Sequence, residues 1–324
     1  MKVLIAGGAG YIGSVTSRLF AEAGYDVVVF DNLVHGHRSA VLPPVRLIPG
    51  DLADASLIDR VIKEERPDCV MHFAALIAVG ESVEKPDLYF YNNVGGGLNL
   101  LNAVGRNRIP RFIFSSTAAV YGTPQQVPIP ESAPVQPNNP YGESKRIFEE
   151  LLAVYARIFG FSYCILRYFN VGGAYQDLGE DHRPETHLIP RILRSLLHPG
   201  ESFEIYGDNY PTRDGSCVRD YIHIYDLARA HLLALQALKD QNLLFNLGSE
   251  TGNTVKEVFA ACERVVGEKI NYTIAPPRAG DVPVLIASSA KIKRELGWKP
   301  EKSLEDIIRD AWVWHKAHPH GYPD

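Results

Sequence analysis

Short apolar runs alternate with segments of helical periodicity along the first half of this 324-residue chain. A buried strand reads as a short continuous apolar run, whereas a helix places its apolar residues three and four positions apart. Regular alternation of the two favours one doubly wound parallel sheet with helices on both faces, an α/β fold. The strand-like runs are residues 3–6, 26–30, 68–74, 111–115 and 162–168, and the helical segments are 11–23, 56–65, 86–104 and 141–159.

In a sheet of this kind, ligands bind beyond the carboxyl ends of the strands. The loops that follow these ends should therefore lie along one edge and form the binding site. They begin after Ala6, Phe30, Phe73, Phe114 and Tyr168.

The pattern becomes less regular after about residue 170. Helical spacing remains at residues 188–197, 226–238, 255–266 and 304–315, with strand-like runs at 203–206 and 243–247. We therefore expect one domain, built on the doubly wound sheet, over residues 1–170 and, mainly over 171–324, a smaller α/β domain that would bind the substrate. Later segments such as 243–247 are expected to return to the main sheet.

Charge and cysteine usage exclude several kinds of partner. Lys and Arg number 33 against 38 Asp and Glu, and a net charge of −5 provides no general field for nucleic acid or an anionic membrane. The four cysteines are scattered without a CxxC motif, which fits a reducing cytosol. No signal peptide or 18-residue apolar run is present. We expect a cytoplasmic protein without nucleic-acid or membrane partners.

The first strand-like run ends in GGAGYIG, residues 7–13. In the spacing of Gly7, Gly10 and Gly13, one glycine permits a tight turn, one lets a pyrophosphate approach the backbone, and one allows the helix to pack on the strand. The helix N-terminus then offers N–H donors to the diphosphate. A merely tight turn is the alternative, but the flanking strand and helix favour a Rossmann-type dinucleotide site.

Asp31 stands at the end of the second strand. A carboxylate there can accept hydrogen bonds from the adenosine ribose and would repel a 2′-phosphate, so it favours NAD over NADP. The alternative is a turn aspartate with Asn32. Asp51 could reach the adenine, or it could cap a turn or helix.

Tyr141 and Lys145 are four residues apart on one face of a predicted helix. A phenol with a pKa near 10 is a poor base at neutral pH, but a neighbouring ammonium and a cationic nicotinamide both favour the phenolate. The pair would take a hydroxyl proton while hydride leaves the same carbon. YxxxK is a common pattern, but here it follows a strand ending in Ser115-Ser116-Thr117, and Thr117 could relay or orient the proton.

Longer stretches across nearly the whole chain match one family. They include FIFSSTAAVYG at residues 112–122, RYFNV at 167–171, GEDHRPETHLIP at 179–190 and VRDYIH at 218–223. With these, the chain resembles the extended short-chain dehydrogenases/reductases and, within them, the UDP-glucose (UDP-galactose) 4-epimerases. The last three stretches are the more specific ones.

The resemblance implies an NAD-dependent isomerase of galactose metabolism that interconverts UDP-galactose and UDP-glucose. Tyr141 would remove the proton of the sugar 4-hydroxyl, with Thr117 in the hydrogen-bond path. Hydride would pass from C4 to tightly held NAD+, and the 4-keto sugar would rotate before hydride returns to its other face. The resemblance also implies a homodimer that pairs residues 86–104 and 141–159 across a two-fold axis, although these faces could be buried within one chain.

Binding roles also follow from the resemblance. Arg219 and Arg278 match diphosphate-binding arginines, and a planar guanidinium suits phosphate, although Arg219 could simply pair with Asp220. The implied cofactor residues are Gly7, Gly10, Tyr11, Ile12, Gly13, Asp31, Asn32, Asp51, Leu52, Phe73, Ala74, Ala75, Asn93, Ser115, Tyr141, Lys145 and Tyr168. The implied substrate residues are Thr117, Tyr141, Asn170, His187, Leu188, Tyr206, Arg219, Arg278 and Asp281.

Three of these roles have plain structural alternatives. Leu188 and Tyr206 are equally plausible as core residues, and Asn93 could face solvent on a helix.

The acidic pair Glu149-Glu150 is expected on a solvated helix face. We expect no metal site, because His182, His187, His223 and His231 do not have the spacing of a ligand cluster.

Two positions depart from the family pattern. Ile77 replaces a lysine that many members carry near the cofactor, and Leu285 stands where a tyrosine narrows the sugar pocket and a small residue admits an N-acetyl group. Activity on UDP-GlcNAc and UDP-GalNAc therefore stays open, as does activity on UDP-pentoses or UDP-uronates. A 4,6-dehydratase is disfavoured because Ala118 and Ala119 replace its acidic pair. A non-catalytic NAD-binding sensor would not need Tyr, Lys and Thr together.

Overall fold

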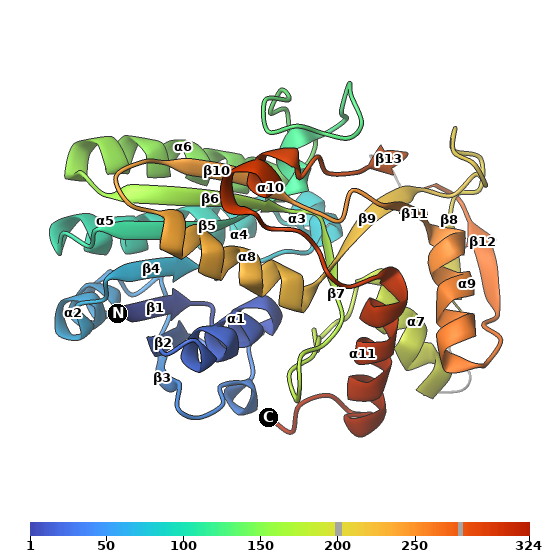
Figure 1. Ribbon diagram of the computed structural model, residues 1–324, viewed down its shortest axis with the longest axis horizontal. Coiled ribbons are helices and arrows are strands. Elements are labelled where there is room, and N and C mark those ends of the chain that lie inside the picture. The colour runs from blue at the N-terminus through green and yellow to red at the C-terminus, as the bar shows by residue number, and fades with distance from the viewer. Residues whose placement is uncertain (198–202, 278–280) are drawn as a thin grey trace.

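The computed structural model describes residues 1–197, 203–277 and 281–324 (Figure 1). Seven parallel strands form the central sheet in the order β10-β6-β5-β4-β1-β2-β3, which confirms the expected Rossmann-type α/β fold. The order reverses on either side of β1, as in doubly wound sheets. The strands are β1 (Lys2–Ala6), β2 (Asp26–Asp31), β3 (Arg46–Pro49), β4 (Cys69–His72), β5 (Arg111–Thr117), β6 (Ser162–Tyr168) and β10 (Leu243–Leu247).

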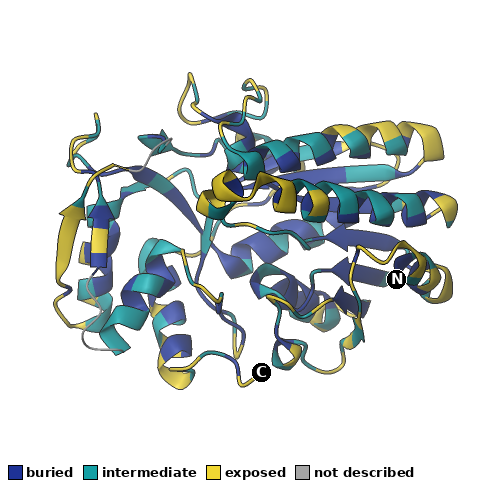
Figure 2. Ribbon diagram, turned by 180° about the vertical axis from the view of Figure 1, so that it is seen from behind, coloured by how far each residue is buried: buried dark blue, intermediate teal, exposed yellow. Residues whose placement is uncertain are grey.

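Helices cover both faces of this sheet. On one face α2 (Ala55–Glu65), α5 (Gly97–Arg106) and α6 (Pro140–Phe159) pack side by side, and on the other α1 (Tyr11–Glu22) packs against α8 (Ile224–Ala237), with α10 (Ala290–Leu296) beside α8. Figure 2 shows the strands buried between these layers and the outer helix surfaces exposed. Each face has its own apolar core, because the side chains of a strand alternate between the two faces.

The segment expected as one long helix over residues 86–104 is divided. It consists of α4 (Pro86–Tyr89), a π-helical segment (Phe90–Gly96) and α5. A side chain at Gly97 would meet the Phe148 ring of α6 at 2.4 Å, so this glycine lets the two helices approach closely. The helical spacing therefore correctly predicted that the backbone is helical over these residues. The glycines weaken the regular α-helix, but they allow it to pack closely against α6.

Strand β3 and helix α3 (Val79–Glu84) are short elements of the first half that the apolar pattern does not predict. β3 is a half-exposed edge strand of four residues, too short and too polar to show an apolar run. Helix α3 is a single short helix between the loop after β4 and α4.

A smaller unit is built mainly from the second half of the chain. Helices α7 (Leu188–Leu197), α9 (Val255–Val266) and α11 (Leu304–Ala317) pack on one another around a separate core. Beside them, β9 (Val218–His223) pairs with β7 (Asn170–Gly172), β11 (Gly252–Thr254) and β13 (Val284–Leu285), and β8 (Phe203–Tyr206) pairs with β12 (Tyr272–Ala275). Because β10 and α8 lie on the central sheet, the second half contributes to both units. The domain division at residue 170 itself stays a prediction.

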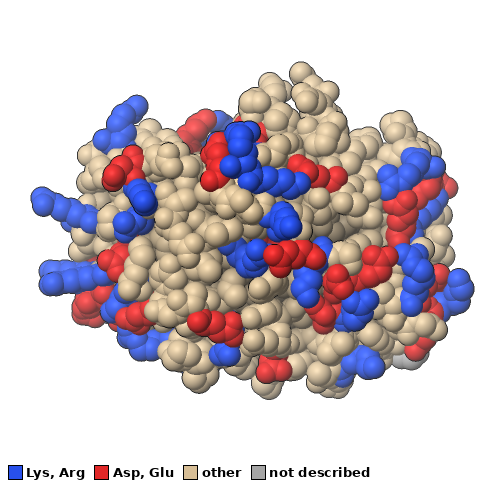
Figure 3. Space-filling model, viewed as in Figure 1, with Lys and Arg blue, Asp and Glu red and all other residues tan. Residues whose placement is uncertain are grey.

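Positive and negative side chains are interspersed on the face viewed in Figure 3. An anionic ligand must therefore be held by particular cationic side chains or by N–H groups rather than by a broad field. Among the described helices, none is both long and apolar enough to cross a lipid bilayer.

Asp226 connects the two units. Its fully buried carboxylate accepts hydrogen bonds from the backbone N–H groups of Glu301 and Lys302 at 3.0 Å, just before α11, and pairs with Arg229.

We predict that Asp226→Ala lowers the free energy of unfolding by about 1–3 kcal/mol, because these donors lose their acceptor. Chemical denaturation checks this. Asp240→Ala, at an exposed position after α8, should change stability by no more than about 0.5 kcal/mol, and equal effects would contradict the prediction.

Candidate active site

The glycine-rich turn between β1 and α1 is tightly enclosed by backbone. Gly7 has a φ of +82°, and a Cβ on it would lie 2.3 Å from the Ala74 nitrogen. A Cβ on Gly13 would lie 2.2 Å from the Gly7 carbonyl oxygen, so both positions exclude any side chain. Helix α1 begins at Tyr11, and Gly10 supplies no side-chain cap. The first N–H groups of α1, including those of Ile12 and Gly13, are therefore available to an anion, and a dinucleotide diphosphate fits this turn.

Asp31 is held at the end of β2, next to this turn. Its buried carboxylate accepts the N–H groups of Ala9 and Leu33, both at 2.9 Å, and burial raises its pKa. Each oxygen keeps a further lone pair that a ribose hydroxyl could use. Asn32 donates instead to Asp51 at 2.8 Å, so these two exposed residues support each other beside Asp31.

The loop after β4 lies across the turn from Asp31. The N–H groups of Phe73 and Ala74 both donate to the Ala6 carbonyl oxygen, and Ala75 follows. Asn93 secures the far end of this loop, because its amide bonds both the N–H and the carbonyl of Leu76, at 2.8 and 3.0 Å. Asn93 is buried rather than solvent-facing, and it also donates to Ser144 of α6.

The remaining predicted cofactor residues lie at neighbouring strand ends. Leu52 follows β3 and is buried close to Gly96, and Ser115 lies in β5. Two tyrosines use their hydroxyls inside the protein: Tyr11 donates to the Gly173 carbonyl at 2.6 Å, and Tyr168 bonds His231 at 2.5 Å. Their hydroxyls are thus engaged in the core.

Tyr141 is brought to Thr117 by a close contact at the start of α6. The Asn139 side chain caps this helix by accepting the Gly142 N–H at 2.8 Å. A Cβ on Gly142 would lie 2.6 Å from the Ala119 carbonyl oxygen, so glycine lets α6 begin directly against the segment after β5. The Tyr141 phenol consequently hydrogen-bonds with Thr117, the last residue of β5.

Lys145 is one helical turn further along α6 and is buried. Its Nζ donates to the Ser115 carbonyl oxygen at 2.9 Å and lies 5.0 Å from the centre of the Phe114 ring. Burial lowers the pKa of Lys145 to about 7, and Glu149 partly opposes this shift. Burial raises the pKa of Tyr141 to about 12, and the hydrogen bond with Thr117 lowers it only in part. In the chain alone, burial is the main influence on the pKa of Tyr141 and keeps its phenol protonated at neutral pH.

Glu149 contradicts the expectation of a solvated helix face. It is buried and pairs with Arg167 of β6 at 2.5 and 3.0 Å, while the Ser116 hydroxyl donates to it at 2.5 Å. Glu150 alone is exposed. Glu149 lies four residues after Lys145 and eight after Tyr141, so helical spacing places all three on the inward face. That spacing was the signal by which the sequence could have identified it.

On the substrate side, Arg219 and Asp281 face each other. The Arg219 guanidinium donates to the Val218 and Val282 carbonyl oxygens at 3.0 and 2.7 Å and lies 3.7 Å from an Asp281 oxygen. The alternative pair with Asp220 does not form, because the buried Asp220 carboxylate accepts the N–H groups of Ser249, Glu250 and Ala287. Arg278 lies outside the described residues.

The other predicted substrate residues are placed at element ends. Asn170 begins β7, Leu188 begins α7, and Tyr206 ends β8, where its hydroxyl donates to Glu204. All three side chains are half-buried, which is compatible both with a binding wall and with packing. Leu285, the position that departs from the family pattern, lies opposite Arg219 in the pairing of β13 with β9, while Ile77 is 37% exposed after β4.

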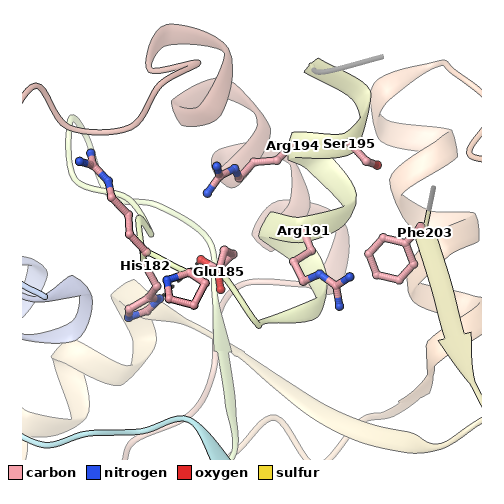
Figure 4. Close-up of a pocket in the computed structure, with 8 residues that line it drawn as sticks. His182, Glu185, Arg191, Arg194, Ser195 and Phe203 are labelled. Carbon is pink, nitrogen blue, oxygen red and sulfur yellow. Dashed lines mark ion pairs between the residues drawn. The ribbon is translucent and has the colours of Figure 1, made fainter. Parts of the chain in front are cut away.

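His187, a predicted substrate residue, has charged partners within the protein. Its Nδ1 lies 2.9 Å from Glu180 and 3.0 Å from Glu185, and the His182 ring is adjacent to the His187 ring. Figure 4 shows His182 and Glu185 together at one end of a hollow, with Arg191 directed from α7 toward Phe203 at the other. Glu180 and Glu185 each stand two residues before a histidine, and this repeated spacing is the sequence signal that could have grouped the four side chains.

Known proteins match the chain over nearly its whole length. The family described as NAD dependent epimerase/dehydratase matches residues 3–248. A UDP-glucose 4-epimerase of Lactobacillus helveticus is 46% identical, with all of both chains covered, and one of Halalkalibacterium halodurans is 48% identical, with 99% of this chain and 98% of that protein covered.

Solved structures agree with these relatives. The UDP-glucose 4-epimerase of Brucella ovis in complex with NAD has a TM-score of 0.93 at 45% identity, covering 96% of this chain and 97% of that one. The Bifidobacterium longum enzyme in complex with NAD+ and UDP has a TM-score of 0.95 at 37% identity, covering 99% and 100%. This chain belongs to the NAD-dependent epimerase/dehydratase family and, within it, to the UDP-glucose 4-epimerases.

Proposed function

We propose that Tyr141 is the acid–base residue of this NAD-dependent UDP-glucose 4-epimerase, with Thr117 and Lys145 assisting it. The enzyme interconverts UDP-galactose and UDP-glucose. NAD supplies the hydride acceptor and donor for C4 of the sugar. The observation that supports the role of Tyr141 is its hydrogen bond with Thr117 at the carboxyl end of β5, one helical turn from the buried Lys145.

Tyr141 needs positive charge nearby to act as a base. Its phenol keeps its proton at neutral pH in the chain alone, because burial raises its pKa to about 12. A cationic group beside a phenol favours the phenolate. Tyr141 therefore takes the proton of the sugar 4-hydroxyl when the bound cofactor is in its oxidised, positively charged form. It returns the proton to the sugar oxygen when that positive charge is gone. Thr117 orients the phenol toward the proton that is transferred.

Lys145 has donors to spare for the cofactor. An ammonium group offers three N–H donors, and one of them is used by the Ser115 carbonyl oxygen. The other two can hold ribose hydroxyls, which keeps the cofactor at the end of β5 next to Tyr141. The buried Glu149 and Arg167 hold this part of α6 against β6.

The uridine diphosphate is assigned to the smaller unit. Arg219 is fixed by two backbone carbonyls, so little side-chain freedom is lost when its guanidinium meets a phosphate. We assign Asp281 to a ribose hydroxyl, and Asn170, His187, Leu188, Tyr206 and Arg278 to the surrounding wall. Binding energy placed on the nucleotide leaves the sugar free to turn between its two hydride-transfer orientations.

We also propose that the enzyme is a cytoplasmic homodimer. Val154, Ile158 and Phe159 of α6 and Tyr91 of the neighbouring π-helical segment are exposed apolar side chains, which fits the implied pairing of these helices. The four cysteines are buried free thiols, which fits a reducing compartment.

Product analysis tests the activity directly. Purified protein is given UDP-galactose without added NAD, with UDP-glucose, UDP-GalNAc and UDP-xylose in parallel reactions. We expect UDP-glucose to form from UDP-galactose with no net NADH, and the parallel reactions report how open the pocket is at Leu285. No conversion even after NAD+ is added would contradict the UDP-hexose assignment.

Replacement of Tyr141 tests the acid–base role. We predict that Tyr141→Phe lowers kcat by about 10²–10⁴-fold and leaves UDP affinity within about twofold, because it removes only the proton-transferring hydroxyl. Steady-state kinetics and UDP titration measure the two effects. Tyr155→Phe is the matched control on the same helix, where the hydroxyl donates to Asn102. Near-normal turnover of Tyr141→Phe would disprove the assignment.

Replacement of Arg219 tests the diphosphate anchor. We predict that Arg219→Ala weakens UDP binding roughly 10- to 100-fold, because a charge-assisted hydrogen bond contributes about 1.5–3 kcal/mol. Calorimetric titration with UDP measures the change. Arg309→Ala, at an exposed position on α11, should bind UDP normally. If the two variants bind UDP equally well, Arg219 does not hold the diphosphate.

Replacement of Asp31 tests the ribose contact. We predict that Asp31→Asn, which is nearly isosteric, weakens NAD retention roughly 10- to 100-fold, because a neutral amide accepts hydrogen bonds less strongly than a carboxylate. Asp26→Asn at the exposed start of β2 is the control. The NAD content of the purified proteins is measured, and unchanged retention in Asp31→Asn would exclude the contact.

A further inference from the structure

Four side chains between β7 and α7 converge on one point: Glu180, His182, Glu185 and His187. One nitrogen or oxygen atom from each lies within 4.8 Å of all the others. His187 Nδ1 is 2.9 Å from a Glu180 oxygen and 3.0 Å from a Glu185 oxygen, and His182 Nδ1 is 3.3 and 3.5 Å from oxygens of the same two residues. Each imidazole thus presents the same nitrogen to both carboxylates.

Hydrogen bonds alone do not account for this arrangement. A single N–H points at one acceptor at a time, so neither ring can serve both carboxylates fully. Within the described residues, His182 Nδ1 and Glu185 Oε2 are buried without any hydrogen bond, although they are only 3.5 Å apart. The Glu185 side chain is only 5% exposed. Unsatisfied buried polar atoms are unfavourable, and a cation between them would satisfy both.

We propose that Glu180, His182, Glu185 and His187 bind one divalent transition-metal ion, preferably zinc. Imidazole nitrogen and carboxylate oxygen bind zinc at about 2.0–2.2 Å, and tetrahedral bonds of this length separate neighbouring ligand atoms by about 3.3–3.6 Å. The histidine–glutamate pairs here are 2.9–3.5 Å apart and all four ligand atoms lie within 4.8 Å of one another, so side-chain rotations can draw them around one ion. Two carboxylates and two neutral imidazoles also balance a charge of +2.

The surroundings indicate a structural role. His182 and Glu185 border a hollow of about 320 Å³ that is also lined by Arg191, Arg194 and Ser195, which gives the ion a path of entry (Figure 4). Four protein ligands leave no position for a reacting water, as in structural zinc sites. The site would fix the segment of residues 180–187. The Tyr11 ring meets the His182 ring edge-on at one part of this segment, and α7 begins at Leu188 directly after it.

Metal binding is tested on untagged, full-length protein after dialysis against a chelator. Zinc is titrated calorimetrically, and Co2+ is added to a second sample as a spectroscopic probe. We expect one zinc per chain, a higher thermal unfolding midpoint with zinc, and the intense visible absorption of four-coordinate Co2+. His182→Gln and Glu185→Gln should each lower zinc affinity roughly 100-fold or more. His35→Gln, at an exposed histidine outside the cluster, should bind zinc normally.

Two results would overturn the proposal. One is wild-type protein with no stoichiometric zinc binding and no change in its unfolding midpoint, which would leave the cluster as paired ions alone. The other is unchanged zinc affinity in both variants. Circular dichroism of the metal-free variants verifies folding, and the Co2+ spectrum of the wild type decides the ligand geometry if a variant does not fold. Substrate is absent from every measurement, so the outcome is independent of the epimerase assays.

Discussion

The close contact between the β1–α1 turn and the loop after β4 is the constraint on which the rest of the site depends. Gly7 meets the Ala74 backbone, and Gly13 meets Gly7, at distances that exclude a side chain. Because of these contacts, the helix N-terminus, the Asp31 carboxylate and residues 73–76 all face the same space. A dinucleotide site here is a consequence of backbone packing, and individual side chains then adjust its selectivity.

A second set of buried contacts sets the position of the reacting groups. Gly142 allows α6 to begin against Ala119, which brings Tyr141 to Thr117, while Lys145 is anchored on Ser115. Further along the same face, Glu149 pairs with Arg167, which also bonds Tyr121, and Tyr121 in turn bonds Asn246 of β10. The chemistry of one strand end is therefore supported by charged and polar groups from three neighbouring strands. Such a network is favourable only when its members are satisfied.

The two structural units share their supports rather than meeting at a simple boundary. α8 and β10 return to the central sheet, and Asp226 at the start of α8 holds the segment before α11. The segment that holds Glu180, His182, Glu185 and His187 lies between the glycine-rich turn and α7. Cofactor-side and substrate-side residues are thereby linked through buried polar contacts, which suits an enzyme that must keep both ligands in register.

Local patterns in the sequence determined the alternation of strands and helices, the glycine turn and the pairing of Tyr141 with Lys145 on one helix face. These features depend on spacing within about twenty residues, and periodicity reports such spacing directly. The same patterns gave no sign of β3, because a short edge strand depends on neighbours distant in sequence. The glycines at 95–97 weakened the helical pattern, but they did not show that a π-helical segment forms at residues 90–96. Only the tertiary structure decided that Glu149 pairs with Arg167, that Arg219 faces Asp281 rather than Asp220, and that two glutamates join His182 and His187. Glu149 and Arg219 meet partners from other parts of the chain, because a buried charge must be paired wherever the fold places it. The two glutamates and two histidines are close in sequence, but only the folded path of their segment brings the four side chains together.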